Sequence, residues 1–448
     1  MNRNLAELAP EQHRYLSQFD AFARRQAGRD PSWLTEKRQA AIRGFSRRGF
    51  PTTRDEAWRF TSLTPLTRTA FAHAGASDSR PVPSDLDSLT GEDSSACRLV
   101  FLNARFSREH SSVGDLPPGV RVQGLSEFLN GQGPSVQEAL GRYAGDGEEP
   151  FAALNTAFLQ DVALVHLPAN TVVEQPIHLH FHSREEGEPV VSHPRCLVLA
   201  GANSQARIVE SYSGAADSLY FTNTVTELVA REGAVIEHYK LQQESLRAFH
   251  IATMQFHLER SATVSSHSIS LGGALVRNHV NAVLDGEGAE TTLNGFSLTT
   301  GRQHVDNHTS IDHAKPHCNS FELYKGILDD RSSGVFNGRI IVRPHAQKTD
   351  SKQTNQNLLL SEEALVNTNP QLEIYADDVK CTHGATIGQL DPQAVFYLQS
   401  RGIGREAARQ LLTFAFANDI ASQIRIEPIR ARLEKTLFHR LAEKGSKE

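Results

Sequence analysis

The chain has 448 residues, of which 22% are charged, and its formal net charge is -6 at pH 7. This length is enough for two or three domains, or for one elongated domain with appendages, and for a substantial buried core. The mild acidic balance argues against a general binder of nucleic acid or of anionic membranes, for which a basic domain or stripe is expected.

The N-terminal part of the chain is predicted to be helical. Apolar residues such as Tyr15, Phe19, Phe22 and Ala23 recur at helical spacing, with charged residues between them. A polar stretch rich in Pro, Ser and Asp follows at residues 75–95 and is typical of a linker. We therefore expect an N-terminal helical region and linker over residues 1–95. A mixed α/β lead-in is expected over residues 96–150, where strand-like CRLVFLNARFS precedes helix-like SVQEALGRYA.

Residues 151–385 are predicted to form the core of the fold from many short strands. Runs such as VALVHLP, RCLVLA, ARIVESYS and RIIVRP are separated by Gly, Asn, Asp and Ser, with almost no convincing long helix between them. This pattern is typical of a β-sandwich, a barrel or a β-solenoid.

A recurring phrase favours the solenoid. GANSQARIVESY, GAVIEHYKL, SATVSSHSISL and GAETTLNGFSL start at residues 201, 233, 261 and 288, which are 32, 28 and 27 residues apart. Self-similarity at a period of about 20 to 50 residues indicates stacked units that bury their apolar faces against one another. We expect a parallel β-helix whose open end needs capping, either by helices or by another copy of the same surface.

One segment of this region concentrates five potential metal ligands: His304, His308, His313, His317 and Cys318. Histidine is the commonest metal ligand, so this segment is a secondary candidate for local metal binding. In a solenoid the five residues would be spread over a strand, a corner and the next strand. The alternative is therefore a set of polar ladders on the faces of the coils.

The segment KCTHGAT, at residues 380–386, places a thiol and an imidazole two residues apart. On an extended strand, residues i and i+2 point to the same face, so Cys381 and His383 would share one ligand. Thiolate with imidazole suits iron, copper or zinc, but a closed tetrahedral site needs about four ligands. The missing ligands would come from distant parts of the chain or from another subunit. The alternative is a structural thiol beside a histidine that satisfies a turn.

A C-terminal helical domain is expected over residues 386–448. Asp391 is a suitable N-cap, Pro392 a suitable first helical residue, and Gly402 a suitable terminator, and two further helices are predicted at residues 405–423 and 427–443. The second helix carries an apolar group: Leu411, Leu412, Phe414, Ala415 and Phe416. These residues either pack among the three helices or form a docking surface for a partner.

The sequence lacks most motifs that would indicate secretion, membrane insertion or a bound cofactor. The four cysteines form no C-x-x-C pair, which fits a reducing compartment and neither a disulfide framework nor a zinc ribbon. The first residues lack the apolar core of a signal peptide, and no segment approaches the roughly 18 apolar residues of a membrane span. We expect a soluble, cytoplasmic protein. No phosphate-binding loop of the known types occurs, so we expect no nucleotide on this chain.

Two long segments carry a resemblance to a known family: VFNGRIIVRPHAQKTDSKQTNQNLLLS at residues 335–361 and PQLEIYADDVKCTHGATIGQLDPQAVFYLQSRGI at residues 370–403. Together with HVDNHTSIDHAKPHCNSFELYKGILDD at residues 304–330 and DEAWRFTSL at residues 55–63, they resemble the SufB/SufD family of iron–sulfur cluster assembly proteins. The resemblance implies a right-handed parallel β-helix between helical ends. KCTHGAT is similar to the SufD type, whereas SufB-type chains have H-E-A-T at this place.

The resemblance also implies partners and roles. Family members form a complex of a SufB chain, a SufD chain and the ABC-type ATPase SufC, which docks on the C-terminal helices. The histidine equivalent to His383 faces SufB across the β-helix interface and is implicated in iron entry or cluster assembly, and Cys381 is the adjacent candidate. SufB chains also carry an upstream cysteine that is thought to receive sulfur. The equivalent position here falls near Ala364, so this chain is not expected to be the principal sulfur acceptor.

We therefore expect a non-catalytic scaffold subunit that shares an iron or nascent cluster site with a SufB-like chain and binds a SufC-like ATPase. A β-helix enzyme acting on polysaccharide or acyl substrates is the alternative, because fold does not imply function. A third possibility is a self-contained metalloprotein that uses the segment from His304 to Cys318. In isolation, the chain could also pair symmetrically with a second copy through exposed β-helix edges.

Overall fold

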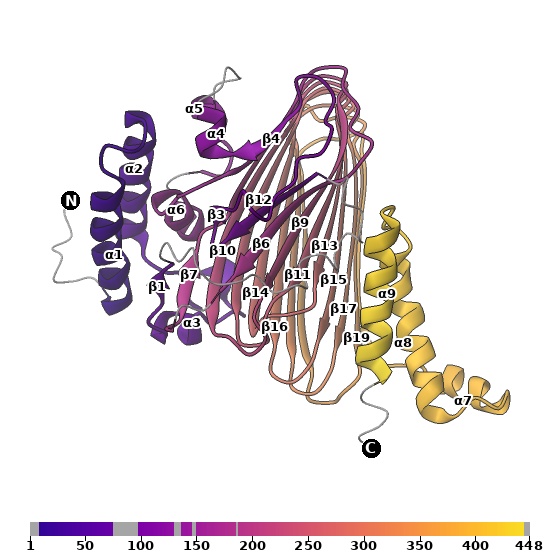
Figure 1. Ribbon diagram of the computed structural model, residues 1–448. Coiled ribbons are helices and arrows are strands. Elements are labelled where there is room, and N and C mark those ends of the chain that lie inside the picture. Colours follow the sequence, from indigo (N-terminus) through magenta and orange to yellow (C-terminus); the bar gives the residue numbers. More distant parts are fainter. Residues whose placement is uncertain (1–8, 75–96, 130–135, 146–148, 185–186, 443–448) are drawn as a thin grey trace.

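The protein is an elongated stack of strands with helices at both ends (Figure 1). The computed structural model describes residues 9–74, 97–129, 136–145, 149–184 and 187–442. The predicted linker at residues 75–95 and the last residues of the predicted C-terminal domain lie outside the described residues. Within the described residues, the elements follow the predicted order of helices, then mainly strands, then helices.

The strands form two sheets that face each other. Sheet A contains, in spatial order, β20 (Leu365–Ile374), β18 (Ser333–Val342), β16 (His304–His313), β14 (Leu275–Leu284), β12 (Phe249–Leu258), β10 (Tyr220–Ala230), β8 (Arg195–Ala200), β5 (Ala163–Leu167) and β4 (Arg121–Gly124), with β7 (Val190–Ser192) beside β10 and β1 (Ala72–His73) beside β7. Sheet B contains β21 (Lys380–Gly388), β19 (Asp350–Leu359), β17 (Asn319–Leu328), β15 (Glu290–Thr299), β13 (Thr263–Ser270), β11 (Val235–Gln243), β9 (Gln205–Gly214), β6 (Ile177–Ser183), β2 (Arg98–Leu102) and β3 (Arg105–Phe106).

The chain alternates between the two sheets, which makes a parallel β-solenoid of about eight turns. In sheet B, Val235 pairs with Gln205, Thr263 with Val235, and Glu290 with Thr263, at spacings of 30, 28 and 27 residues. These spacings follow the repeat in the sequence, and the predicted β-helix is confirmed. The coil length varies in the corners, while most strands keep about ten residues.

The inner faces of the two sheets enclose the main core. Sheet A supplies Leu228, Met254, Phe256, Val280 and Ile311 to this interior, all fully buried. Because successive side chains of a strand point to opposite faces, every second residue of each strand is turned inward. Residues in register on neighbouring strands point to the same face, so these core residues show which residues of the neighbouring strands point inward.

Helices of the N-terminal region cover part of the outer face of sheet A. They are α1 (Pro10–Gln26), α2 (Ser32–Arg48), the 3-10 helix η2 (Glu56–Trp58), α3 (Thr64–Arg68), α4 (Leu125–Leu129), α5 (Val136–Ala139) and α6 (Pro150–Ala157). Tyr15, Phe45 and Phe151 form a buried aromatic cluster with Phe221 and Phe249 on the outer face of the sheet. Burial on both faces gives central strands such as β10 no exposed residue.

Three C-terminal helices follow the last strand: α7 (Pro392–Ser400), α8 (Arg405–Ala421) and α9 (Glu427–Ala442). The side chain of Asp391 accepts a hydrogen bond of 2.9 Å from the backbone N–H of Gln393, and Gly402 takes a φ of 85° after α7, as the sequence predicts. The second and third helices lie against the outer face of sheet B, where Ile420, Ile424 and Leu433 pack among its apolar side chains. The first helix projects away from the body (Figure 1). Among the described helices, none is long and apolar enough to cross a membrane.

Candidate functional site

The solenoid ends at β20 and β21, each the last strand of its sheet. Within the described parts of the chain, no strand pairs with the outer edge of either one. Every residue of β21 is exposed or half-buried, whereas the preceding strands of sheet B are largely buried. The interior of the last coil is therefore open to solvent at this end.

Cys381 and His383 lie on β21 and point inward. Cys381 is in register with Ser351, and His383 with Gln353. Ser351 and Gln353 are both buried inward-facing residues of β19, so the two residues above them share the same orientation. His383 is exposed only because no further coil covers it. The predicted arrangement of the two side chains on one face of a strand is thus present at the open end.

The backbone of the same residues faces the free edge. Lys380 N–H donates to Thr349 of the neighbouring coil at 2.8 Å, and N–H groups alternate in direction along a parallel strand. The N–H groups of Cys381 and His383 therefore point away from β19. On β20, the N–H of Leu365 donates to the carbonyl of Ser332, in the neighbouring coil, at 3.1 Å. Because the direction alternates along the strand, the nitrogen of Pro370 faces the open edge, where proline offers no N–H donor.

The thiol of Cys381 is half-buried against a small apolar cluster that includes Ile340, Val342 and Ala376. Burial raises the pKa of Cys381, and the nearby carboxylate of Asp350 raises it further. At neutral pH the group is a thiol rather than a thiolate. A metal bound here would have to displace this proton, which weakens binding by the isolated chain.

The secondary metal candidates do not converge on one point. His304 and His308 lie on the outer face of sheet A, whereas His313 points inward and lies 2.9 Å from the hydroxyl of Ser320. His317 occupies a corner with a φ of 59°, and the Cys318 thiol is buried and donates to a backbone carbonyl. In the part of the chain that the structure describes, no three His, Cys, Asp or Glu side chains are placed to hold a metal ion.

His304 and His308 instead belong to a buried contact with the N-terminal segment. Asp306, between them on β16, forms an ion pair with Arg277 and accepts a hydrogen bond from Thr61. The guanidinium of Arg277 lies 3.7 Å from the ring centroid of Trp58. These contacts give the segment DEAWRFTSL a structural role, since its Trp58 and Thr61 join the N-terminal region to sheet A.

The apolar residues of α8 divide between two environments. Phe414 and Phe416 pack partly against sheet B, and the Phe416 ring also receives the ammonium of Lys325 at 4.1 Å. Leu411 is 49% exposed, and Leu412 is half-buried. Of the two roles considered for this helix, packing and docking, the structure gives Phe414 and Phe416 the packing role.

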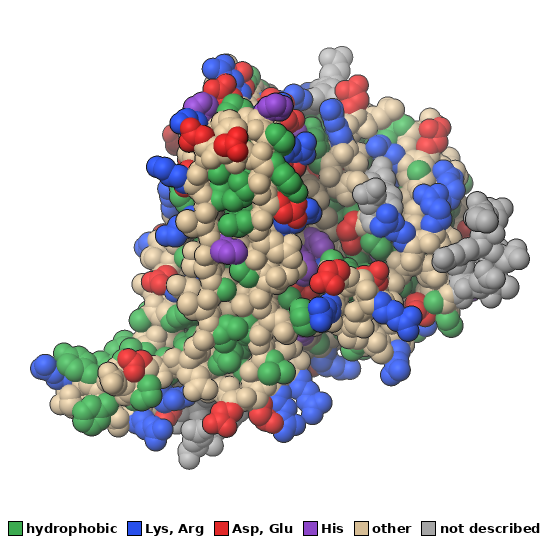
Figure 2. Space-filling view, turned by 180° about the vertical axis from the view of Figure 1, so that it is seen from behind, with side chains coloured by type: hydrophobic (Ala, Val, Ile, Leu, Met, Phe, Trp, Pro, Cys, Tyr) green, Lys and Arg blue, Asp and Glu red, His purple; other side chains and the backbone are tan. Residues whose placement is uncertain are grey.

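A more exposed apolar surface lies on α7. Phe396 is 70% exposed and Tyr397 is 58% exposed, and α7 has no buried residue. The lobe at the lower left of Figure 2, where this helix lies, carries a group of hydrophobic side chains. An exposed pair of aromatic side chains on a projecting helix is typical of a protein-binding surface.

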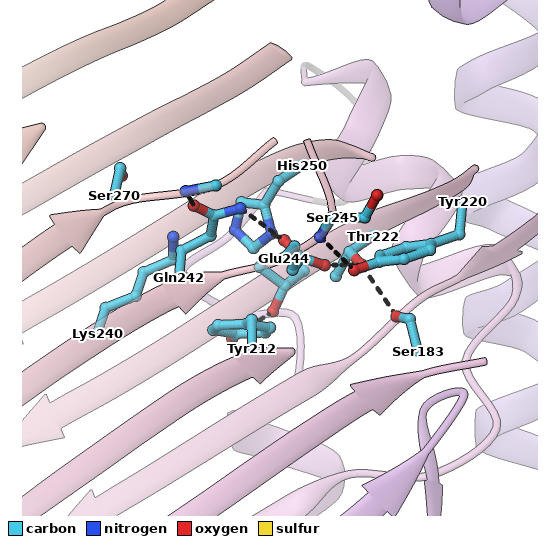
Figure 3. A network of polar contacts seen from close by, with 12 residues as sticks. Ser183, Tyr212, Tyr220, Thr222, Lys240, Gln242, Glu244, Ser245, His250 and Ser270 are labelled. Atoms are coloured by element: carbon cyan, nitrogen blue, oxygen red, sulfur yellow. Dashed lines mark hydrogen bonds and ion pairs between the residues drawn. The ribbon is translucent and has the colours of Figure 1, made fainter. Parts of the chain in front are cut away.

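A cluster of buried ionisable side chains inside the solenoid was not predicted (Figure 3). Glu244 accepts a hydrogen bond of 2.6 Å from Thr222, and its carboxylate lies 2.7 Å from Nδ1 of His250. Lys240 donates to the side chain of Asn278 at 2.9 Å, and burial lowers the pKa of Lys240 to about 8. The cluster lies several coils away from the open end and stabilises the stacking of coils around β11.

Three alternating histidines of β6 form a second unpredicted network. Ser211 Oγ lies 2.6 Å from Nε2 of His178 and 2.6 Å from Nδ1 of His180, and Ser213 Oγ lies 3.1 Å from Nε2 of His180 and 2.9 Å from Nδ1 of His182. Burial lowers the pKa of His178 to about 3 and of His182 to about 4, so both rings are neutral. The available signal was the alternation in IHLHFHS. Ring nitrogens that bind serines are not free for a metal.

Comparison with known proteins identifies the family. A family model described as "SUF system FeS cluster assembly, SufBD core domain" matches residues 181–416, and a model of the SufBD N-terminal region matches residues 9–179. The chain is 36% identical over 422 residues to an iron–sulfur cluster assembly SufBD family protein of Synechocystis, covering 91% of each chain. It is 32% identical over 405 residues to the iron–sulfur cluster assembly protein SufD of Escherichia coli, covering 90% of this chain and 92% of that one.

A plant protein is also similar. The chain is 32% identical over 391 residues to the chloroplastic protein ABCI7 of Arabidopsis thaliana, covering 85% of this chain and 80% of that protein. The two family models together span the N-terminal helices, the solenoid and the start of the C-terminal helices. The chain therefore belongs to the SufBD family of SUF-system iron–sulfur cluster assembly proteins.

Proposed function

We propose that this chain is a SufD-type, non-catalytic scaffold subunit of the cytoplasm that pairs with a SufB-like sister chain through the open end of its solenoid. His383, with Cys381, supplies half of a site for iron or a nascent iron–sulfur cluster at that junction. The observation that carries the proposal is the coincidence of a ligand pair and a free backbone edge on one strand, β21.

Strand geometry supports a shared site. Adjacent strands in a sheet lie about 4.8 Å apart, and side chains in register point to the same face. A partner strand that paired with the free N–H groups of Cys381 and His383 would place its own inward side chains beside these two residues. Ligands from two chains would then meet inside the joined solenoids, where water is scarce.

The half-site is weak by itself. Two ligands do not complete a tetrahedral iron site, and Cys381 keeps its proton because burial raises its pKa. Metal therefore binds after the partner chain has supplied further ligands. This order makes assembly of the subunits a condition for loading iron.

The C-terminal helices are proposed to bind a SufC-like ABC ATPase. Phe396 and Tyr397 of α7 offer two exposed aromatic anchors, and Leu411 of α8 adds apolar surface. In this arrangement the nucleotide stays on the ATPase, and its conformational change is transmitted to the solenoid junction through α8, which packs on sheet B.

The test is to substitute His383 in the reconstituted complex and to measure iron after anaerobic assembly. His383→Ala should leave folding and the yield of complex unchanged, while iron or cluster content falls at least several-fold. Thr382→Ala is the matched control, since Thr382 is exposed on the same strand but points to the other face. Equal iron content in His383→Ala and wild-type complexes of equal yield would refute the role of His383.

A further inference from the structure

A column of inward-facing side chains runs from the open end into the solenoid beneath His383. His383 is in register with Gln353 of β19, and Gln353 is in register with Glu322 of β17. Gln353 is 1% exposed and Glu322 is 3% exposed. An imidazole, an amide and a carboxyl group therefore follow one another at the spacing of adjacent strands, which is about 4.8 Å.

The amide of Gln353 is held in one orientation. Its Nε2 donates a hydrogen bond of 2.8 Å to Oε2 of Glu322. From the opposite sheet, Gly338 approaches so closely that a methyl group at this position would overlap with the amide. Above pH 7, where Glu322 is ionised, an amide flip would place the amide oxygen against the carboxylate, so that two acceptors would face each other. The structure therefore assigns Nε2 to Glu322 and leaves Oε1 for another donor.

The other end of this amide is buried and has no partner. Oε1 of Gln353 accepts no hydrogen bond from any residue that the structure describes. The buried hydroxyl of Thr309 makes no hydrogen bond to Oε1 of Gln353, although it is close enough to Glu322 to lower the pKa of that carboxyl group. A buried amide oxygen normally has a hydrogen-bond partner, so a donor directly above it is expected. The side chain above Gln353 is that of His383.

We infer that Gln353 is the positioning residue for His383: the exposed imidazole turns over Gln353, and its ring N–H donates to Oε1, which has no partner in the orientation that the structure shows. A carbonyl oxygen can only accept, so the inward ring nitrogen must carry the proton and the outward nitrogen keeps its lone pair. Metal-bound histidines commonly donate their second N–H to such an acceptor, which fixes the tautomer and the ring orientation. The consequence for metal binding rests on the proposed function of His383, whereas the consequence for its tautomer does not.

The tautomer is measured first, in the full-length chain with ¹⁵N-labelled histidine. The side-chain nitrogen signals of His383 are assigned by their loss in His383→Ala. In the wild-type chain, one nitrogen should have the shift of a protonated ring nitrogen and the other that of a bare one. Gln353→Met should bring the two shifts together, because the two tautomers then exchange freely. Unchanged shifts in Gln353→Met would overturn the inference.

Matched variants separate this role from general packing. Asn355→Met removes another buried amide of the same strand, in register with Ala385 rather than with a histidine, and should leave the His383 signals unchanged. Glu322→Gln keeps an acceptor for Nε2 of Gln353 and should also preserve them. If Gln353→Met fails to fold, Gly338→Ala displaces the same amide from the opposite sheet and should release the tautomer. Loss of the His383 signals in Asn355→Met would overturn the inference.

Iron affinity is measured next, in the complex with the partner chains, by competition with a chelator. Gln353→Met should weaken iron binding about 10- to 100-fold, as is typical for loss of a group that orients a metal-bound histidine. If His383→Ala also leaves iron binding unchanged, the proposed function fails while the tautomer result stands. If His383→Ala abolishes binding but Gln353→Met has no effect, the metal role of Gln353 is refuted.

Discussion

The ion pair between Asp306 and Arg277 gives the sharpest prediction of stability. Both side chains are fully buried between the outer face of sheet A and the N-terminal segment. Arg277 also donates to the carbonyl of Ala57 at 2.7 Å and lies over the ring of Trp58. The change Asp306→Asn keeps the shape of the side chain and removes its charge, so it leaves a buried guanidinium without its counter-ion.

The expected cost is about 3 kcal/mol. Removing one partner of a buried ion pair typically costs about 3–5 kcal/mol, and the contacts of Arg277 with Ala57 and Trp58 favour the lower end of this range. A domain has a total stability of only about 5–15 kcal/mol. Because the lost contact joins the N-terminal segment to the solenoid, the N-terminal helices should open before the solenoid unfolds.

Hydrogen exchange measured by peptide distinguishes local opening from global unfolding. In Asp306→Asn, peptides from residues 9–71 should exchange on the order of 100-fold faster, at about 1.4 kcal/mol per factor of ten, while peptides from β11 to β15 change little. The control is Asp312→Asn on the same strand, where the pair with Arg343 lies at the surface and is worth about 0–1 kcal/mol.

A double variant tests the physical reason. Asp306→Asn with Arg277→Met should be more stable than Asp306→Asn alone, since it removes the uncompensated charge. Arg277, His308 and Thr61 outweigh the effect of burial and hold the pKa of Asp306 below its usual 3.8. This contribution is therefore complete at neutral pH and is lost only as the pH falls into strong acid. Wild-type exchange rates in Asp306→Asn, or no gain in the double variant, would contradict the argument.

Three further outcomes are expected. Burial raises the pKa of Glu322 from 4.5 to about 7, so its contribution to stability is largest below pH 4.5 and falls as the pH rises to 7. The free energy of unfolding of Glu322→Gln should therefore exceed that of the wild type by up to roughly 3 kcal/mol at pH 8 and by little at pH 4.5. Urea unfolding that shows the same difference at both pH values would contradict this. Phe396→Ser with Tyr397→Ser should weaken ATPase binding about 100-fold in a pull-down titration without lowering the melting temperature, whereas Phe438→Ser, which removes an exposed aromatic of α9, should not. His180→Ala removes a hydrogen-bond partner from the hydroxyls of Ser211 and Ser213, and should lower the free energy of unfolding by about 2–4 kcal/mol. A decrease under about 1 kcal/mol in urea unfolding would show that the network is dispensable.

The repeat and the common face of Cys381 and His383 were accessible from the sequence because both depend on local periodicity. Successive coils share a phrase, and the spacing of Cys381 and His383 by two residues fixes that they share a face once the segment is a strand. The start of α7 was equally accessible, since Asp391 and Pro392 act within one turn of the chain.

The direction in which a strand faces was not accessible. In β10 every residue is buried, because the core covers one face and helices cover the other. Alternation of apolar and polar residues is then lost, and inward and outward positions look alike in the sequence. The same limit applies to α8, whose apolar residues resemble a docking surface until sheet B is seen to cover Phe414 and Phe416.

The free edges of β20 and β21 have a consequence for the supply of this protein in the cell. They expose about two strand lengths of backbone, and Pro370 removes only one donor from them. Long unpaired edges are templates for adding strands from any available chain, including a second copy. Chains made in excess of their partner would therefore collect as homodimers or aggregates. Synthesis in a fixed ratio with the partner would prevent this self-association.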